Sequence, residues 1–192
     1  MSISGEYAIV GVYAEDAIGS NSGAAYIFKR DGNIWTQTAK LTASDGTTSD
    51  YFGYAVSISG DYAVVDSTLD DDKGTDSGSV YIFQRNGSSW NQIQKITAKY
   101  GTDYNKFVRY VCISGDYIIV GEPYDDSNGP DTGAAHIFEK NDASWAFVNK
   151  ISTNDKAAVD YFGFNVSISD DYAIIGACND DENGSNSGSS YF

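Results

Sequence analysis

Residues 52–65 read FGYAVSISGDYAVV, and this stretch decides the fold of the chain. Its first part, residues 52–59, alternates large with small side chains, the period of two that is typical of a β-strand. Gly60-Asp61 follows as a pair that readily adopts positive φ, which a two-residue hairpin turn requires. Residues 62–65 are apolar on both faces and therefore predict a strand that is buried between neighbours.

The same pattern returns every 55 residues without an insertion or deletion. Four sets of identical residues keep this step: Tyr7, Tyr62, Tyr117 and Tyr172; Gly23, Gly78, Gly133 and Gly188; Trp35, Trp90 and Trp145; and Lys40, Lys95 and Lys150. A fixed period of this length indicates one supersecondary unit per repeat. The chain is therefore divided into units at 1–50, 51–105, 106–160 and 161–192, of which the first and the last are incomplete.

Each complete unit is expected to hold four strands. In the second unit a long loop, Asp66 to Gly78, leads to a third strand over residues 79–84, which ends at the hairpin signal Asn86-Gly87. A more polar fourth strand over residues 90–97 suits an outer edge. Four-stranded units at this period are typical of propeller blades, which cover one another's apolar faces. We therefore expect an all-β protein, a β-propeller built of four-stranded antiparallel blades.

Charge and composition exclude several classes of partner. The formal net charge of −15 disfavours nucleic acid and anionic membrane surfaces, because both need a basic face. No run of 18 apolar residues is present, so no membrane insertion is expected in this segment. The start of the sequence shows no signal peptide. Cys112 and Cys178 occupy different places in the repeat, so a disulfide within a unit is not expected.

The residues also argue against catalysis. His136, the one histidine, stands where the other units have Tyr26, Tyr81 and Tyr191, which indicates a packing position in a strand. A Ser-His-Asp or Cys-His arrangement would need this histidine. The sequence has no Cys/His cluster for zinc and no phosphate-binding loop before a helix. We therefore expect that the chain is not an enzyme and has no catalytic residues.

The loops between the second and third strands are rich in acidic residues, and two interpretations stay open for them. Carboxylate and amide oxygens are the ligands that Ca²⁺ prefers, and a glycine lets a loop turn around the ion. The alternative is a set of solvated turns, in which Asp, Asn, Ser and Gly serve turn geometry alone. The candidate calcium ligands are Asp70, Asp72, Asp76, Asp125, Asp131, Asp180, Glu182 and Asn186.

The repeated residues resemble the FG-GAP repeat, the unit of the integrin α-subunit head and of many surface proteins. The FG element is present as Phe52-Gly53 and Phe162-Gly163, whereas the third unit has Phe107-Val108. The GAP element is closest in Gly121-Glu122-Pro123, and Ser-Gly pairs or their equivalents end at Gly23, Gly78, Gly133 and Gly188. The resemblance covers the whole chain. It implies a propeller of about seven blades, used for adhesion or ligand recognition, often with Ca²⁺ in some blades. The acidic loops look like shortened relatives of the integrin-type calcium loop but do not have its spacing.

About three and a half blades of a probable seven would then be present, so we expect a piece of a longer protein. The resemblance implies an extracellular or cell-surface location and a protein or glycan ligand. An alternative is an accessory propeller of a larger secreted enzyme of phospholipase or hydrolase type. An inert truncated product is a third possibility.

Overall fold

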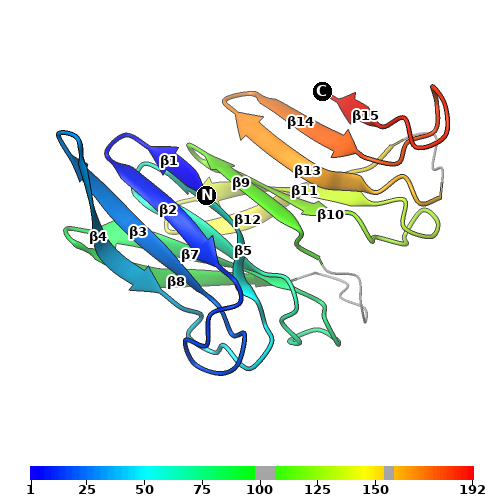
Figure 1. Cartoon of the computed structure of the whole chain (residues 1–192). Coiled ribbons are helices and arrows are strands. Elements are labelled where there is room, and N and C mark those ends of the chain that lie inside the picture. The colour runs from blue at the N-terminus through cyan, green and yellow to red at the C-terminus, as the bar shows by residue number, and fades with distance from the viewer. Residues whose placement is uncertain (98–106, 154–157) are drawn as a thin grey trace.

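The computed structural model describes residues 1–97, 107–153 and 158–192, which form fifteen β-strands (Figure 1). Across these residues no helix is long and apolar enough to cross a membrane. The strands are β1 (Ser2–Ser4), β2 (Tyr7–Val12), β3 (Ala24–Asp31), β4 (Ile34–Leu41), β5 (Phe52–Ser59), β6 (Tyr62–Ser67), β7 (Ser79–Asn86), β8 (Ser89–Thr97), β9 (Tyr110–Ser114), β10 (Tyr117–Glu122), β11 (Ala134–Asn141), β12 (Ser144–Ile151), β13 (Phe162–Ser169), β14 (Tyr172–Ala177) and β15 (Ser189–Tyr191).

These strands make four separate antiparallel sheets in which each strand pairs with its neighbour in sequence. The orders are β1-β2-β3-β4, β5-β6-β7-β8, β9-β10-β11-β12 and β13-β14-β15. We call them the first to fourth sheets. The all-β prediction is confirmed, and sheets of three or four strands, one for each repeat, are consistent with propeller blades.

The strand ends follow the turn residues, but three strands are longer than expected: β7 continues to Asn86, β8 begins at Ser89, and β6 is extended as well. Gly60 and Gly87 have φ values of 56° and 62° in the hairpins that precede β6 and β8, as their turns require. The second strand of the second sheet was expected to end at residue 65, but β6 continues to Ser67. It does so because Asp66 pairs with Val80 and Ser67 with Ser79 in the ladder to β7.

The hydrophobic core lies between sheets rather than within one. In β6, Val65 packs in a cluster with Ile9 of the first sheet, whereas Val64 packs in another with Ile113 of the third. Both valines are fully buried. The prediction of a strand buried on both faces is therefore confirmed, and each inner sheet supplies apolar surface to two neighbours.

The repeated tryptophans and tyrosines join the sheets near their hairpin ends. Trp90 on β8 meets Tyr7 of the preceding sheet edge-to-face, with ring centroids 6.1 Å apart. Trp145 on β12 contacts Tyr62 in the same way at 5.8 Å. Edge-to-face pairs of this kind are favourable beyond their buried area, which gives these two residue types a structural role in the repeat.

The Phe-Gly pair makes the closest contact between sheets. Gly53 has a φ of 90°, which a residue with a side chain rarely adopts, and the pairing register of β5 is interrupted between Phe52 and Val56. This bend carries Phe52 to the first sheet, where its N–H donates to the carbonyl of Ser22 at 3.1 Å. A Cβ added to Gly11 would lie 2.0 Å from the carbonyl oxygen of Gly53, so the two backbones touch directly.

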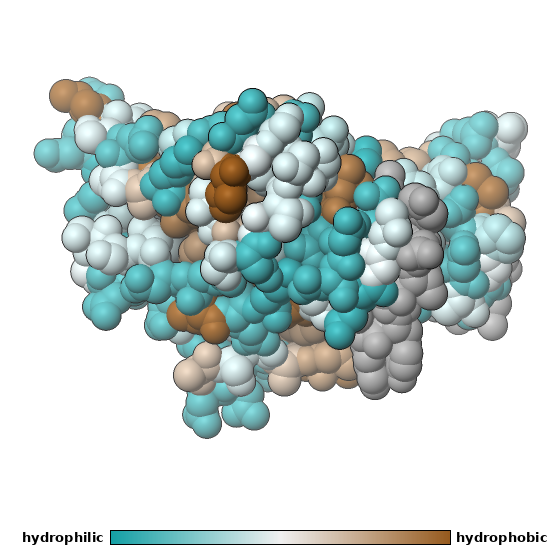
Figure 2. Space-filling view, turned by 90° about the horizontal axis from the view of Figure 1, so that it is seen from below, coloured by the Kyte–Doolittle hydropathy of each residue, from teal (hydrophilic) through white to brown (hydrophobic). Residues whose placement is uncertain are grey.

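Seen from below the view of Figure 1, the surface is mainly hydrophilic, and hydrophobic residues form small separate groups (Figure 2). This is the surface expected of a chain with a formal charge of −15.

Candidate functional site

The acidic loops join the second and third strands of the sheets and lie at the opposite end from the hairpins that join the first and second strands (Figure 1). They cover residues 13–23, 68–78, 123–133 and 178–188. Loops on a rigid β-scaffold are common positions for binding residues, so we treat this end of the molecule as the candidate site.

Asp70, the first carboxylate of the second loop, accepts hydrogen bonds from side chains of its own sheet. Asp70 is buried, and its Oδ2 accepts hydrogen bonds from Lys95 Nζ and from the Tyr81 hydroxyl, both at 2.9 Å. Its Oδ1 accepts from Ser79 Oγ at 2.9 Å and from the N–H of Asp72 at 3.2 Å. Both oxygens of Asp70 are therefore engaged by donors of the protein itself.

Equivalent residues hold the other loops, and we call Glu15, Asp70, Asp125 and Asp180 the anchor carboxylates. Lys40 Nζ lies 2.6 Å from Glu15, and Lys150 Nζ lies 2.6 Å from Asp125. The Tyr191 hydroxyl donates to Asp180 at 2.6 Å.

The charges and hydroxyl donors beside Glu15, Asp125 and Asp180 favour the ionised forms of these three anchors. Burial raises the pKa of Asp125, but the hydrogen bonds from Lys150 and Ser127 outweigh it, so the pKa lies below its ordinary value. Lys40 lowers the pKa of Glu15, and Tyr191 lowers that of Asp180. At neutral pH the loops are thus fixed by hydrogen bonds to negatively charged groups, and in the first three by ion pairs.

A second aspartate closes each loop, and we call these residues the turn aspartates: Asp16, Asp71, Asp126 and Asp181. Each accepts a hydrogen bond from the backbone N–H five residues later, at 2.5 to 2.8 Å. The donors are Asn21, Asp76, Asp131 and Asn186, which have φ values between 49° and 54°. Asn and Asp tolerate this left-handed conformation better than other residues with side chains. Asp76, Asp131 and Asn186 therefore have a turn role that requires no metal ion.

The structure brings candidate calcium ligands of one loop together, but a hydrogen-bond donor of the protein itself lies between them. Lys95 Nζ lies 2.9 Å from Asp70 and 2.6 Å from Asp72, where an added cation would have to be. The N–H of Glu182 donates to Asp180 at 3.0 Å. Among the described residues no three His, Cys, Asp or Glu side chains are placed to hold a metal ion. The second and third loops therefore do not fit Ca²⁺ while their lysines stay in place, and calcium binding stays a prediction.

His136, which is half-buried, pairs with the buried Glu122, a contact that the sequence did not indicate. Its Nε2 lies 2.7 Å from Glu122 Oε2, and the ring packs edge-to-face on Phe107 at 5.2 Å. Burial raises the pKa of Glu122, and the hydrogen bond with His136 offsets part of this shift. The equivalent tyrosines Tyr26, Tyr81 and Tyr191 bind anchor carboxylates, so His136 differs from them by turning to another acid.

The junction of the second and third sheets contains a fully buried acid, Asp66. It stands where the first and third sheets have Gly11 and Gly121, while Val108 stands where the facing strands have Gly53 and Gly163. Both departures from the repeat thus fall at one contact between sheets. Each is visible in the sequence, but their pairing is not, because it depends on how neighbouring sheets meet.

Burial raises the pKa of Asp66 to about 8. Hydrogen bonds from the N–H of Ala55 at 2.6 Å and from the Thr68 hydroxyl at 2.7 Å, with the charge of Arg109, oppose part of the shift. The Arg109 guanidinium lies 4.9 Å from the ring centroid of Tyr54, and its buried Nε has no hydrogen-bond partner among the residues that the structure describes. At the junction of the second and third sheets, a buried polar group therefore takes the place of the close glycine contact that the other two junctions have.

We predict that Asp66 makes the stability of the chain depend on pH. Its folded-state pKa lies above the ordinary unfolded value near 4, so between these values the folded chain retains a proton that the unfolded chain has lost. Stability should fall as the pH rises through this window, by up to about 1.4 kcal/mol per pH unit. In Asp66→Asn this contribution should be absent, and urea unfolding at about pH 5 and about pH 8 measures it.

Asp31→Asn is the matched control, because it removes one carboxylate charge at an exposed position. It should keep the pH dependence of the wild-type chain. Equal slopes for the wild type and Asp66→Asn would show that Asp66 does not hold the proton.

A sequence profile described as FG-GAP repeat matches the chain four times, over residues 1–28, 35–83, 90–138 and 145–192. The second match runs from β4 of the first sheet to β7 of the second, so the matched unit is offset from the sheet by one strand. A search of curated proteins found no match.

Proposed function

Because the chain belongs to the FG-GAP repeat family, we propose that it is a non-catalytic, adhesion-type binding module of the cell surface or the extracellular space. It recognises a protein or glycan partner through the acidic loops at one end of its sheets. The supporting observation is that the loops share the residues that fix their conformation, which we call the base. They differ in an exposed residue, which we call the tip.

The base of each loop is built on the same plan. Each has an anchor carboxylate and a turn aspartate, and a serine or threonine whose hydroxyl donates to the anchor's carbonyl in the last three loops. The rigid base costs a ligand little ordering entropy on binding.

The tip differs from loop to loop. Ile18, Lys73, Asn128 and Asn183 occupy one repeat position, and Ile18, Lys73 and Asn183 are exposed. The N–H groups of Ile18 and Lys73 donate to Ser22 Oγ and Ser77 Oγ, so the backbone is held while the side chain is free. Such positions can change ligand contacts without changing the fold.

The test uses the purified chain on a printed glycan array and on an immobilised basic protein such as lysozyme. We expect saturable binding to one of these probes. The triple variant Ile18→Ala, Lys73→Ala and Asn183→Ala should weaken it about tenfold or more, a loss of about 1.4 kcal/mol that truncation of one important interface residue can cause. A control triple variant at the hairpin end, Asp31→Ala, Asn86→Ala and Ser144→Ala, should bind as the wild type does.

Equal loss in both triple variants, or no binding to either probe, would contradict the role of the loops. Cleavage of a glycan probe by the purified chain would contradict a non-catalytic module. Repeating the assay and a thermal melt in Ca²⁺ and in EDTA tests calcium: a melting temperature unaffected by the chelator removes a structural ion from the proposal.

A further inference from the structure

One position of the repeat forms a row along the edge of the stack where the first strands of the sheets lie side by side (Figure 1). Tyr54, Arg109 and Phe164 occupy this position in successive units. The Arg109 guanidinium lies 4.9 Å from the ring centroid of Tyr54 and 5.6 Å from that of Phe164. The arginine therefore stacks on two aromatic rings, a favourable cation–π arrangement.

Further aromatic residues continue the row on both sides of the arginine. Tyr13, which is 44% exposed, contacts the rings of Tyr54 and Tyr51, with centroids 5.3 and 5.7 Å apart. At the other end, Tyr110 contacts Phe164 at 5.6 Å. We call this set of six residues the inner row: Tyr13, Tyr51, Tyr54, Arg109, Tyr110 and Phe164.

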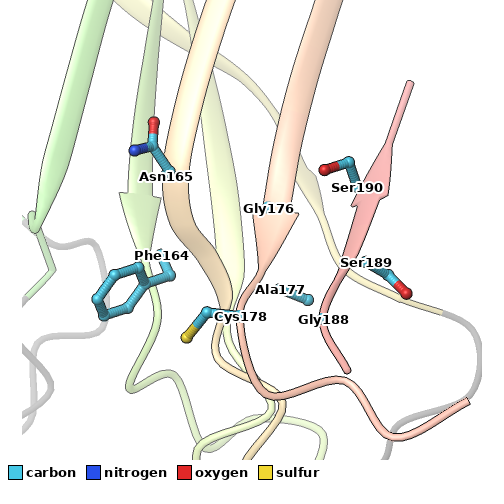
Figure 3. A pocket seen from close by; sticks show the side chains of 8 residues that line it. All are labelled: Phe164, Asn165, Gly176, Ala177, Cys178, Gly188, Ser189 and Ser190. Carbon is cyan, nitrogen blue, oxygen red and sulfur yellow. The ribbon is translucent and has the colours of Figure 1, made fainter. Parts of the chain in front are cut away.

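Each contact of the inner row joins two neighbouring sheets. Tyr13 follows β2 of the first sheet and meets rings of the second, whereas Arg109, directly before β9, meets rings of the second and the fourth. Figure 3 shows the ring of Phe164 turned away from Ser189 and Ser190 of β15. The row therefore does not depend on the open outer face of the first or the fourth sheet.

The charge and the hydrogen-bond donors of Arg109 are available to a ligand. In the described part of the chain its guanidinium makes no ion pair and no hydrogen bond, whereas Arg85 pairs with Asp61. The buried Asp66 does not neutralise the charge at neutral pH, because burial raises its pKa to about 8 and the carboxyl is mainly protonated. The half-buried side chain is held in place by the two rings on which it stacks.

The chemistry of the inner row fits a sugar that carries a carboxylate. The planar guanidinium matches the two oxygens of a carboxylate, which accept paired hydrogen bonds from it. The tyrosines combine an apolar ring with a polar hydroxyl, as a sugar combines an apolar ring face with hydroxyls. Among the described residues the hydroxyls of Tyr13, Tyr51 and Tyr54 make no hydrogen bond. Because the chain has a formal charge of −15, the row suits a ligand with one negative charge better than a polyanion.

We propose that the inner row binds a carboxylate-bearing sugar of a glycan. The carboxylate accepts paired hydrogen bonds from Arg109, and the sugar rings pack on the neighbouring tyrosines. The row contains none of the tip residues Ile18, Lys73 and Asn183, so the site is a second one and does not rest on the role proposed for the loops.

The test titrates the purified chain, by calorimetry, with cellobiouronic acid and with cellobiose, which has a CH₂OH group in place of the carboxylate. We expect saturable binding of the acid, about tenfold or more tighter than that of the neutral disaccharide. Arg109→Gln should remove this preference, because a glutamine amide has neither the charge nor the paired donors. Tyr13→Ala should weaken the binding of both sugars by a similar factor, because packing on the ring does not depend on the charge.

Arg30→Gln is the matched control. Arg30 is an exposed arginine whose guanidinium lies 5.9 Å from the ring centroid of Trp35, away from the inner row. This variant should bind the acid as the wild type does, and so should the triple variant Ile18→Ala, Lys73→Ala and Asn183→Ala. The comparison of the two sugars on the wild-type chain needs no variant, so it tests the proposal even if Arg109→Gln does not fold.

Three results would overturn the proposal. The first is no saturable binding of the acid, or equal affinity of the wild-type chain for the two sugars. The second is equal affinity of Arg109→Gln and wild type for the acid, or a loss of binding in the triple variant, which would assign the sugar to the loops. The third is displacement of the acid by a triglutamate peptide that binds more tightly, which would assign the row to an acidic peptide.

Discussion

Gly121→Ala should lower the free energy of unfolding by about 3 kcal/mol, the upper range for overpacking a tight contact. The added methyl group would lie 2.0 Å from the carbonyl oxygen of Gly163. Neither partner is a flexible side chain, so the third and fourth sheets would have to move apart, and the hydrophobic cluster that includes Ile119 and Phe162 would loosen. Urea unfolding followed by circular dichroism measures the loss.

The same substitution at the equivalent position of the fourth sheet is the matched control. Gly176→Ala meets no atom closer than 3.7 Å and its φ is not positive, so its effect should stay within about 0.5 kcal/mol. The difference between two chemically identical changes isolates the contact between sheets. Equal unfolding midpoints for the two variants would show that the third and fourth sheets do not meet at Gly121.

Phe52→Ala should cost about 3 to 5 kcal/mol, as is usual for a buried phenylalanine. Phe52 is fully buried, and its ring meets Tyr81 and Phe83 edge-to-face at 5.4 and 6.1 Å. The loss leaves a cavity at the junction of the first and second sheets. Because domains are commonly stable by 5 to 15 kcal/mol, the variant should unfold at a much lower urea concentration.

Phe192→Ala controls for the loss of an aromatic side chain, since Phe192 is 96% exposed. Its unfolding midpoint should match that of the wild type. A wild-type midpoint for Phe52→Ala as well would mean that the Phe-Gly element does not join the sheets.

In the acidic loops, residue type alone did not predict which groups the carboxylates contact. From the sequence, Asp70 and Asp72 are candidate calcium ligands, because carboxylates attract cations. The structure adds a cation of the protein, Lys95, at 2.9 and 2.6 Å from them. The lysine was visible as part of the repeat, but it comes from the outer strand of the sheet, 25 residues after Asp70. The turn roles of Asp76 and Asn186 agree with the alternative interpretation of these loops as solvated turns, because Asp and Asn at left-handed positions are a local feature.

The amino-acid sequence alone predicts the repeat, the all-β class, the hairpin turns and the burial of residues 63–65. These depend on periodicity and on local backbone preferences, which act between residues near one another in the chain. The tertiary structure fixes which residues of adjacent sheets meet, such as Gly11 against Gly53 and Arg109 over the ring of Tyr54. Such pairings depend on how two stacked surfaces fit at distances of a few ångströms, and residues of one unit do not specify them without the neighbouring unit in place.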